Sequence, residues 1–184
     1  MKILLARLAL CVALATSVGC ASPPPSQGPN EPSRVEVAFS PEGGAEALVL
    51  RVIDSSHVSL RLAGYSFTSP SVVKSLMGAK RRGVDVKVLV DDRGNRGAAS
   101  RSAMRLVTGA GIPMRVISAY AIHHDKYIVV DGRTTETGSF NFSQVAARSN
   151  SENVLVVWND ERVAARYQVH WNSRWVQGIE VEID

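Results

Sequence analysis

Residues 124–142, HDKYIVVDGRTTETGSFNF, predict two β-strands joined by a tight turn. The run YIVV at 127–130 is β-branched and apolar, which is typical of a buried strand. The Asp131-Gly132 dipeptide that follows is a hairpin turn signal, because both residue types tolerate positive φ angles. The threonines between positions 134 and 137 indicate a second strand that leads back along the first. This stretch therefore predicts a β-hairpin.

The open end of that hairpin carries polar side chains suited to an anionic phosphate. His124 and Lys126 are two residues apart, so both would point to one face of an extended segment. Ser139 and Asn141 have the same spacing on the returning side, and the hairpin would bring all four towards one spot. Lysine supplies a positive charge, serine and asparagine supply neutral donors, and histidine supplies a nucleophile or a proton carrier. The hairpin therefore predicts a phosphate site.

Strands and helices alternate along the rest of the chain. Alternating or β-branched runs predict strands at residues 35–39, 57–67, 84–90, 114–117 and 154–158. Apolar periodicity with capping residues predicts helices at residues 45–53, 71–82, 98–108 and 161–177, with a short connector or helix start at 143–148. Such alternation predicts an α/β fold: one domain with a mixed, largely parallel β-sheet flanked by helices on both faces.

The N-terminus has the layout of an export signal. Lys2 and Arg7 are followed by an apolar run and then by small residues, so residues 1–21 are predicted to be a signal peptide. Alternatively, the sequence SVGC at 17–20 is a degenerate lipoprotein signal that ends before Cys20, which would then be lipidated. Residues 22–33 form a Pro-rich linker, and residues 34–184 form the domain. We expect an exported protein, periplasmic or secreted, or anchored to a membrane as a lipoprotein.

Charge and cysteine content narrow the classes further. Cys11 and Cys20 both lie in the predicted signal segment, so the mature domain has no cysteine left for a disulfide. The formal net charge of the whole chain is +4. Lys2 and Arg7, which belong to the predicted signal peptide, contribute part of this charge, so the mature protein is only weakly basic. Whole-chain charge therefore does not by itself indicate a nucleic-acid partner.

Two chemical routes to phosphodiester cleavage leave different marks in a sequence. A metal-dependent enzyme needs a cluster of carboxylates. Asp91 and Asp92 follow the strand at 84–90, where α/β sheets place ligand loops, but no second acidic motif accompanies them. Loop capping is therefore the favoured role for this pair. The metal-free route needs a side-chain nucleophile and a separate acid, and His124 fits as the nucleophile.

The chain carries a single H-x-K motif. In-line displacement puts the attacking atom and the leaving oxygen on opposite sides of phosphorus, so one imidazole cannot serve both. His123 would point to the opposite face of an extended segment, and neither His57 nor His170 has a lysine two positions on. We therefore predict a symmetric homodimer whose two-fold axis passes through the active site, each copy contributing one His124.

The spacing H-x-K-x4-D-x6-G-S-x-N-F between His124 and Phe142 resembles the signature of the phospholipase D superfamily. From about residue 35 to residue 176, the chain is similar to the small, secreted, single-motif bacterial endonucleases of the Nuc type. The segments that carry this similarity are GYSFT at 64–68, KRRGVDVK at 80–87, RGN at 93–95 and SEN at 151–153. The resemblance implies a phospholipase D-like fold, an EDTA-resistant reaction without a metal or other cofactor, and a homodimer with a shared active site.

The resemblance also implies roles for single residues. The catalytic set would be His124, Lys126, Ser139, Asn141 and Glu152. In that set, Glu152 would orient the active-site histidine and fix its tautomer, and Ser139 would assist it or bind phosphate. Asp131 and Gly138 occupy motif positions whose role would be structural, Asp131 by bridging charged neighbours.

Three functions follow as hypotheses. The first is a metal-independent phosphodiesterase that cleaves DNA or RNA with little sequence specificity, through a phosphohistidine on His124 and with the second His124 of the dimer as general acid. The first alternative is a phospholipase D that produces phosphatidic acid by the same chemistry. The second alternative is a non-catalytic binding module. Activity towards nucleic acid and phospholipid in EDTA, with and without His124, separates the three.

Overall fold

The structure is a computed structural model that describes residues 32–182. The predicted signal peptide, Cys20 and most of the Pro-rich linker lie outside the described residues. Within them the helices are α1 (Ala45–Asp54), α2 (Pro70–Arg81), η1 (Arg93–Asn95, a 3-10 turn), α3 (Ala98–Gly109), α4 (Gln144–Arg148) and α5 (Glu161–Trp175). The strands are β1 (Arg34–Ser40), β2 (Ser59–Gly64), β3 (Asp85–Asp91), β4 (Met114–Ile117), β5 (Tyr127–Val130), β6 (Thr134–Gly138), β7 (Glu152–Trp158) and β8 (Ile179–Glu180).

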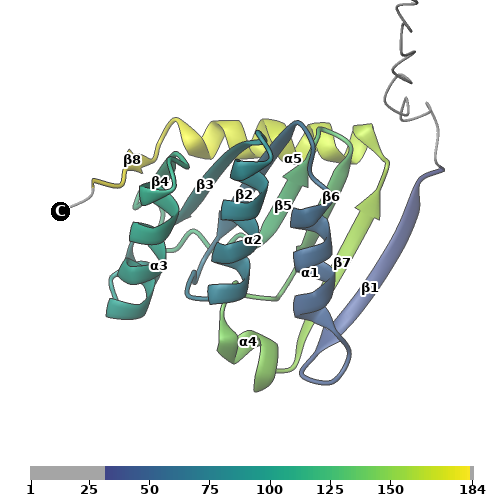
Figure 1. Ribbon diagram of the computed structural model, residues 1–184, viewed down its shortest axis with the longest axis horizontal. Coiled ribbons are helices and arrows are strands. Elements are labelled where there is room, and N and C mark those ends of the chain that lie inside the picture. The colour runs from purple at the N-terminus through teal and green to yellow at the C-terminus, as the bar shows by residue number, and fades with distance from the viewer. Residues whose placement is uncertain (1–31, 183–184) are drawn as a thin grey trace, which may run out of the picture.

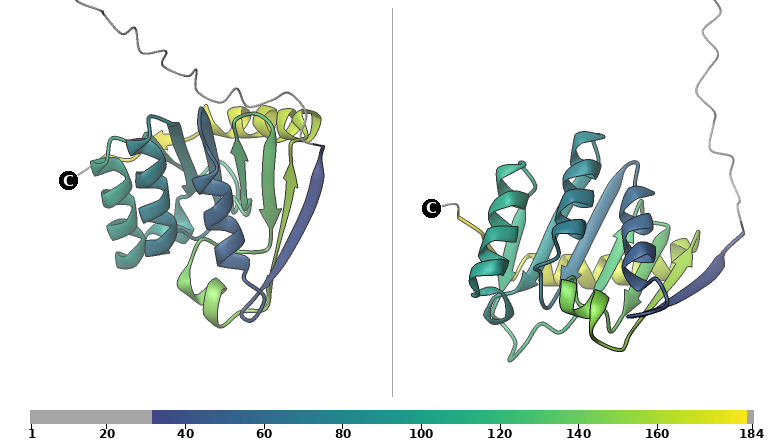
Figure 2. Two further views of the ribbon diagram at one scale, coloured as in Figure 1. Left: turned by 45° about the vertical axis from the view of Figure 1, so that its right-hand side comes forward. Right: turned by 60° about the horizontal axis from the view of Figure 1, so that its bottom comes forward.

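All the strands belong to one eight-stranded sheet with the order β1-β7-β6-β5-β2-β3-β4-β8. Helices α1, α2 and α3 lie side by side on one face, and α5 crosses the other (Figures 1 and 2). The predicted single domain, with a mixed sheet and helices on both faces, is therefore confirmed. In the part of the chain that the structure describes, no helix is both long and apolar enough to cross a membrane.

The expectation that the sheet is largely parallel is wrong. Only β2–β3 and β3–β4 pair in parallel, whereas β1–β7, β2–β5, β4–β8, β5–β6 and β6–β7 are antiparallel. The parallel pairs are those joined by a crossover helix, α2 or α3. The hairpin sequence of β5 and β6 forces antiparallel pairing, and β7 continues that meander.

The predicted hairpin is confirmed residue by residue. Asp131 and Gly132 have φ angles of 53° and 64°, as the two central residues of a type I′ turn require. The Arg133 N–H closes the turn on the Val130 carbonyl at 3.0 Å. Tyr127 pairs with Thr137 at the other end of the ladder.

The core has two parts, one on each face of the sheet. The larger cluster fills the space between the sheet and α1–α3, and the smaller one lies under α5. Trp171 of α5 anchors the smaller cluster, and its indole N–H donates to the Leu62 carbonyl at 3.1 Å. Because α5 lies across the sheet at this point, its side chains stand beside the start of β5.

Candidate active site

The predicted site residues gather at one end of the central strands of the sheet. Since β5 runs antiparallel to β2, the segment that leads into β5 meets the carboxyl end of β2. The end of β6 and the start of β7 reach the same edge, because both pair antiparallel within the meander. His124 and Lys126 therefore lie near Ser139, which follows β6, and Glu152, which opens β7. This end of the sheet thus receives side chains from three separate segments of the chain.

Lys126 is a buried cation held against an exposed imidazole. Its side chain donates from Nζ to the His124 carbonyl at 2.8 Å, although the residue is only 6% exposed. The Nζ atom also lies 5.4 Å from the centre of the Tyr65 ring, and the His124 ring meets the same tyrosine edge-on at 4.8 Å. Burial lowers the pKa of Lys126, and the charges of Glu152 and Asp125 partly offset this. Two of the three ammonium donors remain for a ligand.

Glu152 contacts Ser139. The Ser139 hydroxyl donates to Glu152 Oε2 at 2.6 Å, and the Asn150 amide donates to Oε1 at 2.8 Å. The Asn153 N–H donates in turn to the Ser139 hydroxyl at 3.0 Å. Within residues 32–182, no hydrogen bond or ion pair joins Glu152 to His124, so one copy of the chain does not supply the orienting contact that the resemblance implies.

Asp131 and Gly138, the two motif positions expected to be structural, both act on the backbone. The Asp131 carboxylate accepts three N–H bonds, from His57, Val58 and Ser59, at 3.0, 2.8 and 2.7 Å. Its partners are therefore backbone amides and not the charged neighbours that we expected. At Gly138, an added Cβ would lie 2.1 Å from the Asn153 carbonyl oxygen, so only glycine fits where β6 approaches β7.

Asn141 stands apart from these contacts. Its Oδ1 atom is buried, and it has no hydrogen-bond partner among the described residues. The next residue, Phe142, fixes the segment, because its carbonyl accepts from the Thr68 and Ser69 amides at 2.9 Å each. The fold therefore anchors the backbone here without using the Asn141 amide oxygen.

The loop after β3 positions the site without entering it. Asp91 accepts N–H bonds from Gly94 at 2.6 Å and from His123 at 2.8 Å, which fixes the backbone next to His124. Asn95 binds the Tyr65 carbonyl at 2.6 Å and the Phe67 amide at 2.9 Å, which holds Tyr65 against the site. The capping role favoured for this loop is therefore correct for Asp91. In the region described, no three His, Cys, Asp or Glu side chains cluster as a metal site would require.

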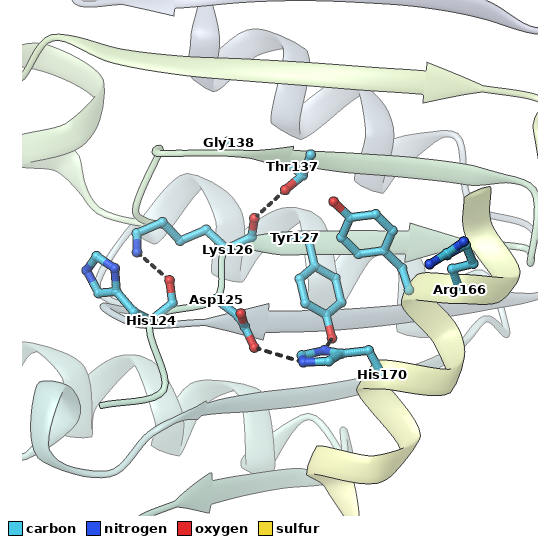
Figure 3. Close-up of a pocket in the computed structure, with 9 residues that line it drawn as sticks. His124, Asp125, Lys126, Tyr127, Thr137, Gly138, Arg166 and His170 are labelled. Carbon is cyan, nitrogen blue, oxygen red and sulfur yellow. Dashed lines mark hydrogen bonds and ion pairs between the residues drawn. The ribbon is translucent and has the colours of Figure 1, made fainter. Parts of the chain in front are cut away.

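A cavity of about 410 Å³ opens beside His124 and Lys126. It is lined by His124, Asp125, Lys126, Tyr127, Thr137, Gly138, Arg166, Tyr167 and His170 (Figure 3). Sequence reasoning did not select Arg166 or His170 as site residues. Their one sequence signal is a spacing of four on a helix, which puts both on one face of α5. Nothing local shows that this face reaches the hairpin.

This geometry, an exposed histidine beside a buried lysine at the edge of a mixed α/β sheet, is that of a phosphodiester hydrolase. The model for the family described as "Cardiolipin synthase, PLD-like domain" matches residues 49–175. The chain therefore belongs to the phospholipase D superfamily, whose members hydrolyse phosphodiesters.

Individual relatives agree with this assignment. The crystal structure of Nuc from Salmonella typhimurium, a phospholipase D family member, is 49% identical, with a TM-score of 0.82 over 83% of this chain and 100% of that one. A phospholipase D of Rickettsia bellii is 31% identical over 77% of this chain and 69% of its own length. The mitochondrial cardiolipin hydrolase of Xenopus laevis is 34% identical over 64% of this chain and 54% of its own length.

Proposed function

We propose that this protein is a metal-independent nuclease that cleaves DNA or RNA with little sequence specificity. The observation that carries the proposal is the cavity beside His124, because none of its lining residues has an aliphatic side chain. Cationic groups suit the phosphates of a nucleic acid and aromatic rings suit its sugars and bases, whereas an acyl chain needs a continuous aliphatic wall. The 49% identity to Nuc supports the same substrate class, given the likeness of the sequence to secreted endonucleases of that type.

The proposed reaction runs in two steps. A nitrogen of His124 attacks phosphorus, an N–P bond forms as the P–O bond to the leaving group breaks, and the leaving oxygen takes a proton from a second imidazolium. In the second step that imidazole takes a proton from water, whose oxygen attacks phosphorus and breaks the N–P bond. Lys126 would offset the charge on the phosphate oxygens throughout, at fixed distance and partly shielded from solvent.

The second imidazole would come from a second copy of the chain, in a homodimer that shares its active site. In support, the described residues hold one His124–Lys126 pair, and Glu152 would have to reach the histidine of the other copy to orient it. On the α5 side of the sheet, Val35, Val37 and Phe39 of β1 form an apolar row that is 63%, 55% and 55% exposed. Such a row is suited to burial in an interface.

The alternative substrate is a phospholipid, hydrolysed by the same chemistry. The names of two relatives favour it: phospholipase D in Rickettsia and mitochondrial cardiolipin hydrolase in Xenopus. A lipid anchor on Cys20 would place the enzyme beside such a substrate. We also propose that residues 1–21 direct export to the periplasm or the medium, with lipidation of Cys20 as the membrane-bound variant.

One assay tests the proposal. Purified protein in EDTA is incubated with plasmid DNA, RNA, and vesicles of phosphatidylcholine or cardiolipin, alongside His124→Ala and, as a matched control, the exposed His57→Ala. We expect nucleic-acid cleavage that survives EDTA, falls by about 10⁴-fold or more without His124, and is unchanged without His57. Cleavage of lipid alone would establish the alternative, and turnover of neither would leave a binding module. Activity that elutes from gel filtration as a monomer would contradict the dimer.

A further inference from the structure

The cavity beside His124 does not end at the catalytic pair. It continues to α5, whose Arg166 and His170 lie across the cavity from His124 and Lys126 (Figure 3), and Tyr167 of the same helix also lines it. The Tyr127 ring stands between the two ends (Figure 3), and the Tyr167 ring meets it edge-on at 4.9 Å. The cavity therefore has a cationic group at each end and aromatic groups between them.

Arg166 is the cation of α5 that the fold does not use. It makes no hydrogen bond, ion pair or ring contact within residues 32–182. The other arginines of the helix are engaged: Arg162 lies 3.7 Å from Asp160, and Arg174 stacks over the Tyr120 ring at 4.8 Å. An unpaired guanidinium in the wall of an active-site cavity is available to an anion.

The one carboxylate among the residues that line the cavity lies beside two histidines. Asp125 Oδ2 lies 3.3 Å from His123 Nδ1 and 3.9 Å from His170 Nε2. The Tyr127 hydroxyl lies 2.9 Å from His170 Nδ1, which fixes the second imidazole over the carboxylate. Burial raises the pKa of Tyr127, so its hydroxyl stays protonated and adds no negative charge. At its α5 end the cavity therefore offers the Arg166 guanidinium to an anion, with His170 beside Asp125.

We propose that Arg166, supported by His170, forms a subsite for the phosphate next to the scissile phosphate on a nucleic-acid chain. This inference rests on the proposed nuclease function. A nucleic acid repeats its phosphates along the chain, so a phosphodiester held at His124 and Lys126 brings a neighbouring phosphate with it. A planar guanidinium binds phosphate through two parallel N–H bonds and so fixes the register of the strand without reading its bases.

The test uses substrates that differ in their neighbouring phosphate. Bis(4-nitrophenyl) phosphate and a thymidine dinucleotide contain one phosphodiester and no second phosphate, whereas the dinucleotide with a terminal 5′- or 3′-phosphate contains both. Arg166→Ala should lower kcat/KM about tenfold on one of the two phosphorylated dinucleotides and leave the two simple substrates unchanged. The affected isomer identifies the side of the scissile bond on which the subsite lies. Arg162→Ala, on the same helix but outside the cavity, should leave all four unchanged.

A second readout separates a phosphate contact from a structural effect. With a single-stranded oligonucleotide, removal of one contact should reduce the slope of log(kcat/KM) against log[salt] by about 0.7 in Arg166→Ala, with partial recovery in Arg166→Lys. Equal loss on all substrates, or no loss on the phosphorylated dinucleotides, would overturn the subsite alone. A wild-type protein that hydrolyses bis(4-nitrophenyl) phosphate but no nucleotide would overturn the nuclease function and the subsite with it.

Discussion

The two ends of the β5–β6 hairpin both carry charged or titratable residues and use them in opposite ways. At the closed end, the Asp131 carboxylate is saturated by three backbone N–H groups. At the open end, within residues 32–182, the Lys126 side chain makes one hydrogen bond, to the His124 carbonyl, and the His124 ring makes only an edge-on contact with Tyr65. We therefore expect the residues of this short motif to divide between structure and chemistry according to whether their hydrogen-bonding capacity is already used.

That contrast gives a way to interpret a motif from a single structure. A charged group whose donors or acceptors are all met by the backbone stabilises the fold, and its loss should appear in the free energy of unfolding. A buried charge with unused capacity is costly to keep, and it is retained where it acts on a ligand. Three substitutions along the hairpin test this distinction.

The largest effect is expected at the open end, in Lys126→Met. Loss of the fixed cation should lower kcat/KM about 10²–10³-fold, while the free energy of unfolding stays the same or rises, because an apolar side chain replaces a desolvated charge. The wild-type activity should also decline with rising pH below the ordinary lysine value of 10.5, because burial lowers the pKa of Lys126. Steady-state kinetics and urea unfolding measure both, with the exposed Lys74→Met as control. A variant that unfolds easily but remains active would reverse the assignment.

At the closed end, Asp131→Gly should act on stability alone. Glycine keeps the positive φ of this position without strain, so the change removes only the carboxylate and some backbone rigidity. We expect a loss of about 2–3 kcal/mol in the free energy of unfolding, with kcat/KM per folded molecule within about twofold of wild type. Asp92→Ala, which breaks an exposed pair with Arg96, should leave the free energy of unfolding nearly unchanged. A fall in activity comparable to that of Lys126→Met would place Asp131 in the site.

Between the two ends lies Glu136, which is fully buried in β6 with an Oε2 that has no partner in the part of the chain described. Burial raises its pKa from 4.5 to about 8. The folded protein then holds a proton that the unfolded chain releases near pH 4.5. The contribution of Glu136 to stability is therefore fully present below that pH and is lost as the pH rises to about 8, by up to about 1.4 kcal/mol per pH unit. Glu136→Gln should flatten this dependence in urea unfolding at several pH values, and Glu42→Gln should not. An unchanged slope in Glu136→Gln would show that another group causes it.

Local patterns predicted the elements of the fold well. The strands Met114–Ile117 and Tyr127–Val130 have the bounds expected from their β-branched runs, and α1 and α3 are each one residue longer than predicted. The short strand β8 and the 3-10 turn η1 were not predicted, because two or three residues carry no periodicity. The predicted strand at 57–67 is longer than β2, since its end turns away to meet Asn95.

The order and direction of the strands were less accessible. Alternating helices and strands suggested a largely parallel sheet, yet only β2, β3 and β4 pair in parallel, although helices also separate β1 from β2 and β6 from β7. β1 pairs with β7, although the two strands lie far apart in the sequence. This pairing depends on which edge of the sheet is free once β5, β6 and β7 have paired. Such pairing joins residues more than a hundred positions apart, and no local signal encodes it.

The sequence by itself determined the hairpin, the His124–Lys126 pair and the family, because turn chemistry and motif spacing lie within one contiguous stretch. Only the tertiary structure decided what surrounds that pair. It set Glu152 against Ser139, placed Tyr65 against both site side chains, and brought Arg166 and His170 of α5 to the far wall of the cavity. The Glu152–Ser139 contact depends on the pairing of β6 with β7. The other contacts depend on how α5 and the loop after β3 pack on the sheet, and packing is a property of the whole core.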